Sequence, residues 1–160
     1  MAVQGCVAAV WRIHAKGPIG EWTFDARWAP GSVRAEGGPS SGQGLVASTW
    51  YHGPTVVSVG APDAEGLANY ERAGLSLPIT WQALVGVDDL SQVFIEEYLP
   101  DGLRLRLPEL RSGEVGQVHF AVAWADAAAH EDASWFAIDV PPRHLLGLFA
   151  HEQPGTSVTG

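Results

Sequence analysis

The sequence predicts a mainly β protein, an antiparallel sheet curled into a barrel or a sandwich, with one or two short helices. Three observations lead to this fold class. About eight segments have strand composition, they follow one another at short spacing with glycine and proline turns between them, and several alternate apolar and polar residues. No internal repeat is visible, so a solenoid or propeller is not expected.

The first two strands are predicted on either side of a Gly-Pro turn. The run from Val3 to His14 is rich in β-branched residues and has no breaker after its first glycine. The segment Glu21 to Trp28 alternates, so that its aromatic residues and one alanine share a face opposite charged and polar residues. The second of these segments is therefore expected to be a half-buried strand.

A loop and a hairpin are expected next. The segment from Gly37 to Gly44 is so rich in glycine and serine that it is predicted to be a loop. Strands follow at Leu45 to Tyr51 and Thr55 to Gly60, separated by His52-Gly53-Pro54.

The middle of the chain contains the predicted helix. Between Asp63 and Leu75, three apolar side chains at helical spacing and a glycine near the end favour one short helix. The segment from Pro78 to Gly86 returns to strand composition and is predicted to be a strand, while Val87 to Leu90 can begin a helical turn.

A β-hairpin is predicted around Pro100-Asp101-Gly102, because this triplet between two β-rich runs is typical of a type I turn followed by a left-handed glycine. With those three residues as the loop, Leu99 faces Leu103. The other predicted pairs are Tyr98 with Arg104, Glu97 with Leu105, Glu96 with Arg106, and Ile95 with Leu107.

Two further apolar runs are predicted to be strands near the centre of the sheet. They extend from Val115 to Ala125 and from Ser134 to Val140, and they are expected to pair across the acidic loop between them. We expect one β-rich domain over residues 1–150 and a flexible tail over 151–160.

Composition excludes several classes of protein. Eighteen acidic and nine basic residues give a net charge of −9, which disfavours nucleic-acid binding. No apolar run approaches the ~20 residues of a membrane helix, and no signal peptide is recognisable. The single cysteine, Cys6, agrees with a cytoplasmic location, and the preference for arginine over lysine suggests a GC-rich bacterium.

No motif for phosphate, dinucleotide or metal binding occurs, so no cofactor and no metal site are predicted. The loop from Asp126 to Asp132 offers possible metal ligands in His130, Glu131 and Asp132. Adjacent residues on a loop rarely converge on an ion without a fixed partner elsewhere, so a solvated loop is the preferred interpretation.

Glu97 and His119 are the two candidate catalytic residues. The predicted register places Glu97 among isoleucine and leucine, where desolvation would raise its pKa into the range of a general acid or base. The alternative is that Glu97 meets an arginine on the solvated face. Alternation places His119 beside Ala121 and Ala123, where there is room for a ligand or for a tryptophan.

Seven tryptophans are many for this length, and they line either a core or a pocket. The candidate ligand-binding residues are Trp22, Trp28, Trp124 and His119. We therefore expect a non-catalytic binding protein that takes a small apolar molecule or a basic protein partner. The alternative is a small β-barrel cyclase or isomerase that acts on a hydrophobic substrate with Glu97 or His119 as acid or base.

Overall fold

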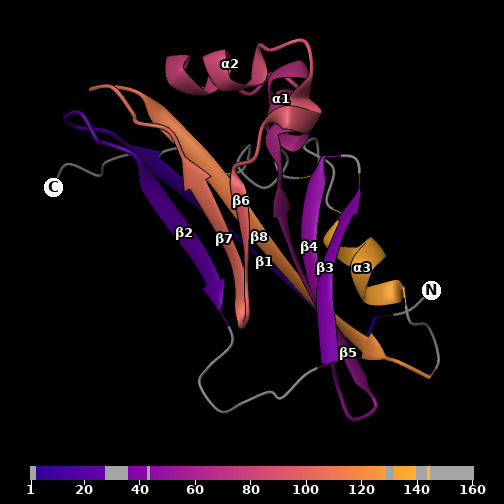
Figure 1. Ribbon diagram of the computed structural model, residues 1–160. Coiled ribbons are helices and arrows are strands. Elements are labelled where there is room, and N and C mark those ends of the chain that lie inside the picture. Colours follow the sequence, from indigo (N-terminus) through magenta and orange to yellow (C-terminus); the bar gives the residue numbers. More distant parts are fainter. Residues whose placement is uncertain (1–2, 28–35, 43, 129–131, 140–143, 145–160) are drawn as a thin grey trace, which may run out of the picture.

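The protein is a sandwich-like arrangement of two antiparallel sheets that do not close into a barrel (Figure 1). The computed structural model describes residues 3–27, 36–42, 44–128, 132–139 and 144. Within them the first sheet has the strand order β1-β8-β5-β4-β3 and the second sheet has the order β2-β7-β6. The predicted fold class is confirmed, in its sandwich form.

The first sheet is built on the long strand β8 (Val115–Asp126), which lies between β1 (Gly5–His14) and β5 (Thr55–Pro62). The pairing of β1 with β8 is continuous over ten residues, from Gly5 opposite Trp124 to His14 opposite Val115. The strands β4 (Leu45–His52) and β3 (Glu36–Gly42) complete this sheet. The strands predicted from Val3, Leu45, Thr55 and Val115 are confirmed.

The second sheet covers one face of the first. It consists of β2 (Trp22–Arg27), β7 (Gly102–Leu107) and β6 (Glu96–Leu99). The predicted alternation of β2 is confirmed, because Trp22, Phe24 and Ala26 are half-buried against the core. The buried side chains between the sheets include Val46, Val59, Leu103, Leu105, Leu107, Val118 and Phe120.

Helices pack beside the first sheet and across one end of the sandwich. Figure 1 shows α1 (Ala64–Arg72) and α2 (Ile79–Val85) together at that end, and α3 (Ala133–Ile138) beside the first sheet. The helix α1 confirms the helix predicted between Asp63 and Leu75. It begins at Asp63, whose carboxylate accepts a hydrogen bond from the backbone N–H of Gly66 at 2.8 Å, and it ends before Gly74, which has a φ of +89°.

Two predicted strands are helices. The segment predicted as a strand from Pro78 to Gly86 forms α2, and the one predicted from Ser134 to Val140 contributes to α3. Each is an apolar run whose buried residues include a pair four positions apart: Trp81 with Val85, and Ser134 with Ile138. One face of a helix therefore buries the apolar side chains that a central strand would have buried on its two faces. The expected pairing across the acidic loop is likewise wrong, because β1 and β5 flank β8.

The segment predicted as a loop from Gly37 to Gly44 contains all of β3 after Glu36, so this prediction is wrong. Its pairing with β4 runs from Glu36 opposite Tyr51 to Gly42 opposite Leu45. Backbone hydrogen bonds to a neighbouring strand require no particular side chain, so an available edge of β4 orders a sequence that has little strand propensity of its own. A single short helical turn, η1 (Leu90–Gln92), follows α2.

The hairpin around Pro100 is confirmed, but its predicted register is wrong by one residue. Gly102 lies opposite Leu99, and Glu97 lies opposite Arg104. The loop is therefore the pair Pro100-Asp101, and Gly102 belongs to β7 without the left-handed conformation expected for it. A one-residue shift in register exchanges the faces of β6, so that Glu96 and Tyr98 share the face of Leu105 and Leu103, and Glu97 lies on the opposite face with Arg104.

Candidate functional site

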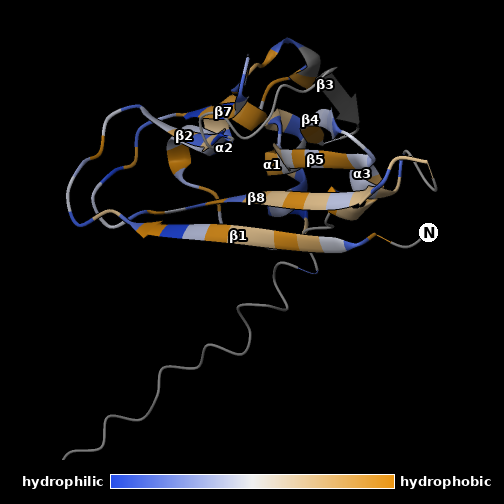
Figure 2. Ribbon diagram, turned by 90° about the horizontal axis from the view of Figure 1, so that it is seen from below, coloured by the Kyte–Doolittle hydropathy of each residue, from blue (hydrophilic) through white to orange (hydrophobic). Residues whose placement is uncertain are grey.

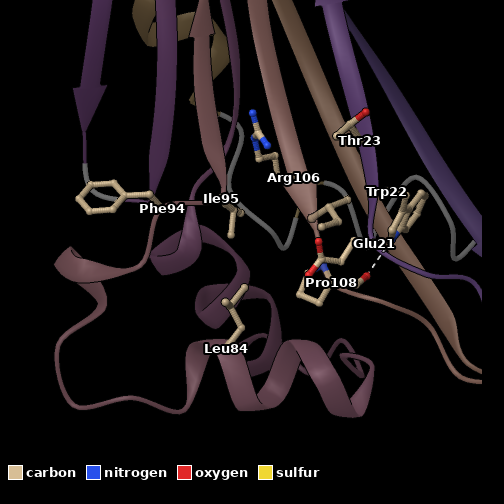
Figure 3. A pocket seen from close by; sticks show the side chains of 9 residues that line it. Glu21, Trp22, Thr23, Leu84, Phe94, Ile95, Arg106 and Pro108 are labelled. Atoms are coloured by element: carbon tan, nitrogen blue, oxygen red, sulfur yellow. Dashed lines mark hydrogen bonds between the residues drawn. The ribbon is translucent and has the colours of Figure 1, made fainter.

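A cleft of about 430 Å³ lies where the ends of β2 and β7 meet α2 (Figure 3). Most of its wall is apolar, and three polar side chains stand among the lining residues. It is lined by Glu21, Trp22, Thr23, Leu84, Phe94, Ile95, Arg106, Leu107 and Pro108. Its size falls within the range of about 300 to 1,000 Å³ that is usual for small-molecule sites.

The position of Trp22 in this cleft is fixed by two neighbours. Its indole N–H donates to the carbonyl oxygen of Pro108 at 2.9 Å, and the fully buried Trp81 donates to the same oxygen at 3.3 Å. The ring centroids of the two tryptophans are 6.2 Å apart. Because the only polar atom of Trp22 already has a partner, what its ring offers a ligand is an apolar surface.

Phe94 and Ile95 form the wall on the side of β6. Ile95 is buried, and its carbonyl oxygen accepts a hydrogen bond from the backbone N–H of Arg106, so the segment is attached to β7. Phe94 is 72% exposed, the highest value among the exposed large apolar side chains of the described residues. An exposed phenylalanine beside a cleft is a candidate contact for an aromatic or aliphatic ligand.

Charged side chains cover the outer face of the second sheet. The carboxylate of Glu97 lies 2.5 Å from Arg106 and 3.5 Å from Arg104. The guanidinium of Arg104 also binds Asp25 through two hydrogen bonds, at 2.7 and 2.8 Å. Arg106 therefore connects this charged network to the edge of the cleft.

Glu97 is not in the apolar setting that the predicted register gave it. The hydrogen bond from Arg106 and the charges of both arginines lower the pKa of its carboxyl, so the expected rise in pKa is wrong. Its alternative setting, beside an arginine on the solvated face, is the one observed. Glu96 instead faces inward, where burial raises the pKa of its carboxyl.

His119 is buried, with 4% of its surface exposed, and its Nδ1 is hydrogen-bonded to the hydroxyl of Tyr70 on α1. Burial lowers the pKa of His119 to about 4 and raises that of Tyr70, so both groups are neutral at neutral pH. Ala121 and Ala123 lie under α3 in a cluster with Ile138. The predicted room beside His119 is therefore filled by protein.

Of the remaining candidates from the sequence, the structure describes Trp124, which does not line the cleft. Trp124 is 37% exposed near the end of β8, and its ring lies where a Cβ on Gly5 would be. Trp28, His130 and Glu131 lie outside the described residues. Within the described part of the chain, no group of three or more histidine, cysteine or acidic side chains is placed to hold a metal ion. No helix in that part has the length and apolar character to span a bilayer.

Of the residues that line this cleft, only Trp22 is among the ligand-binding candidates predicted from the sequence. Leu84 was assigned to a strand, and Phe94 and Arg106 were assigned to a hairpin with the wrong register. The signal that is present is Phe94 itself, an aromatic residue in the short apolar run from Val93 to Ile95 that precedes two glutamates. Only the packing of α2 against β2 and β7 shows that this ring borders a cleft.

Comparisons with known proteins identify no relative of this chain. No family model matches the chain, and neither the curated proteins nor the solved structures yield a significant match.

Proposed function

We propose that this protein is a binding protein that takes a small apolar molecule, preferably an aromatic one, in the cleft between α2 and the ends of β2 and β7. The observation that carries the proposal is the composition of that cleft. Trp22, Phe94, Leu84 and Leu107 surround a volume suited to a small molecule. The chemistry is that of contact and burial, and it needs no reacting group.

The polar side chains suggest how such a ligand is oriented. Arg106 and Glu21 are both at the cleft, and the side chain of Arg106 is 62% exposed even though its guanidinium is paired with Glu97. An aromatic molecule with one anionic group can place its ring against Trp22 and Phe94 and its charge near Arg106. Glu21 disfavours a ligand with more than one negative charge.

The cyclase or isomerase alternative lacks comparable support. Its candidate acid or base residues, Glu97 and His119, do not line the cleft. Glu97 is held in its charged form by two arginines, and His119 is enclosed with Tyr70. A basic protein partner is favoured by the net charge of −9 alone, so the cleft remains the basis of the proposal.

The test uses the fluorescent dye 1-anilinonaphthalene-8-sulfonate, which combines an apolar aromatic body with one anionic group. We expect binding to the native chain that weakens about tenfold in Phe94→Ala, since the loss of an aromatic contact is worth about 0.5 to 1.5 kcal/mol beyond the area lost. Phe136→Ala is the matched control, because Phe136 is also exposed, at 55%, but lies on α3 away from the cleft.

A second variant fills the cleft. Leu84→Trp adds volume to its wall and is expected to prevent dye binding while circular dichroism shows an intact fold. Neutral naphthalene, compared with the dye in Arg106→Gln, shows whether the charge contributes: only the dye should lose affinity. Dye affinity that is the same in Phe94→Ala, Phe136→Ala and Leu84→Trp would contradict the proposal.

A further inference from the structure

We infer that the outer edge of β1, with which no other strand of the described residues pairs, joins β1 of a second copy of this chain, so that the two first sheets form a symmetric dimer. Figure 2 shows β1 as the outermost strand of its sheet, next to β8 and largely in the colours of apolar residues. Its side chains are mostly exposed, including Val7 at 59% and Trp11 at 40%.

The four sheet edges in the described part of the chain differ in how they are protected against pairing. The strand β6 has only four residues, β3 carries a proline at its centre, and β2 alternates apolar residues with charged ones at Asp25 and Arg27. Short length, proline and charge are the usual devices that prevent edge-to-edge association. Three of the four edges therefore carry such a device.

The edge of β1 has almost none of these protective features. It is ten residues long, has no proline and no acidic residue, and pairs with β8 without a bulge. Arg12 and His14, near its end, are its only ionisable residues apart from Cys6. A long, regular, apolar edge of this kind is a template for another strand.

The backbone hydrogen bonds show which residues of β1 direct their N–H and C=O groups away from β8. Ala15 donates its N–H to Glu114 at 2.9 Å, and on the other side of β8 Ala127 donates to Pro54 at 2.8 Å. Along a strand, the backbone N–H and C=O groups of successive residues point to alternate sides. Both bonds therefore indicate that the odd-numbered residues of β1 direct these groups toward β8. The N–H and C=O groups of Cys6, Ala8, Val10, Arg12 and His14 therefore point away from the sheet.

A second copy satisfies these groups in an antiparallel register with Val10 on the twofold axis. In that register Ala8 lies opposite Arg12 of the second copy, so the two guanidinium groups do not face each other. On the other face, Trp11 lies opposite Ala9, and a large ring meets a small side chain. This self-complementarity is why we assign the edge to a second copy and not to an unrelated strand.

The expected dimer is weak. Nine paired residues at about 3.4 Å each, on a sheet about 10 Å thick, give about 300 Å² of contact per copy, whereas a standard interface has about 800 Å² per partner. Sedimentation equilibrium of the full chain should therefore show a monomer and dimer in exchange, with a dissociation constant of about 0.1 mM.

Three substitutions at Ala8 test the pairing and its register. Ala8→Pro removes an N–H that points away from β8, so it should abolish the dimer and leave the β1–β8 pairing in place. Ala8→Lys puts an ammonium group opposite Arg12 of the second copy and should weaken the dimer about tenfold, whereas Ala8→Glu should tighten it by a similar factor. Both charged variants keep the backbone of β1 unchanged, so they decide the matter if the proline variant does not fold.

A wild-type chain that is monomeric at about 1 mM would overturn the inference. Equal dissociation constants for Ala8→Lys and Ala8→Glu would do the same, because the register requires the two to differ in opposite directions. Open-ended aggregation in place of a dimer would also contradict it, since a twofold pairing uses the free edge of β1 in both copies.

Discussion

Gly102 offers the sharpest test of how the two halves of the second sheet fit together. It lies opposite Arg27 in the pairing of β2 with β7, with extended backbone and no positive φ. A Cβ at this position would overlap the carbonyl oxygen of Ala26 and lie 3.0 Å from the Cα of Arg27. Both neighbours are backbone atoms of β2, which cannot move aside by changing a rotamer.

The cost of Gly102→Ala follows from this contact. The ends of β2 and β7 have to separate by several tenths of an ångström or more, which disturbs the adjacent ladder, and overpacking of this kind costs about 1 to 3 kcal/mol. We expect a value near the upper end, about 3 kcal/mol. For a domain of this size that corresponds to a fall in Tm of about 6 to 12 °C.

Gly113 is the matched control. Its φ is +86°, and no atom lies within 4 Å of the position that a Cβ would occupy. Gly113→Ala should therefore cost only the left-handed conformation, about 1 to 2 kcal/mol, and Gly113→Asn should cost less than that because asparagine tolerates this conformation. Gly102→Asn should be at least as harmful as Gly102→Ala, because its Cβ meets the same backbone.

Urea denaturation of the four variants measures these differences as shifts in midpoint at constant slope. The reasoning would be refuted if Gly102→Ala cost no more than Gly113→Ala, or if asparagine rescued Gly102 and not Gly113. The second result would mean that Gly102 has the left-handed conformation expected from the sequence.

Three further predictions concern other parts of the fold. The pKa of His119 is about 4 in the folded chain and about 6.5 in the unfolded chain, so the unfolded chain binds more protons between these values. The free energy of unfolding should therefore fall by about 3 kcal/mol as pH is lowered from 7 to 4. The dependence of the urea midpoint on pH should differ between wild type and His119→Asn across that window, and equal dependence would contradict the assignment. Ala121→Leu should cost about 1 to 3 kcal/mol of stability, because Ala121 is fully buried beneath α3. Adding Ile138→Ala to the same chain should recover part of this loss, whereas additive costs in a double-mutant cycle would show that the two side chains do not share space. Asp25→Asn should cost about 1 kcal/mol at low salt, because Asp25 binds both Arg104 and Arg27, and less at high salt; a cost independent of salt would exclude a Coulombic origin.

The elements that were predicted correctly are those with strong local signals. In β2 the strict alternation of apolar and polar residues is compatible with a half-buried strand and with little else. In α1, Asp63 at the start and Gly74 after the end define a helix whatever surrounds it. The position of the turn at Pro100-Asp101 belongs to the same group, because proline and aspartate favour turns through their own backbone preferences.

The errors share a different cause. The runs that form α2 and α3 are apolar and short, so their periodicity fits either a strand or a helix, and the contacts of Trp81 and Ile138 with the sheets decide between them. For β3, an available edge of β4 outweighs a composition of glycine and serine. In the hairpin, Gly102 lies close to the backbone of β2 in the observed register, and this contact between distant segments is not visible in the sequence.

The sequence by itself determined the class of fold, the acidic character of the chain, the faces of β2 and the place of its main hairpin, because each depends on residues that are near one another in the chain. Tertiary structure alone decided the register of that hairpin, the helical state of α2 and α3, the enclosure of His119 by Tyr70 and the cleft beside Phe94. Each of these depends on contacts between segments far apart in the sequence, where a shift of one residue moves a carboxylate such as Glu97 from an apolar face to a pair of arginines.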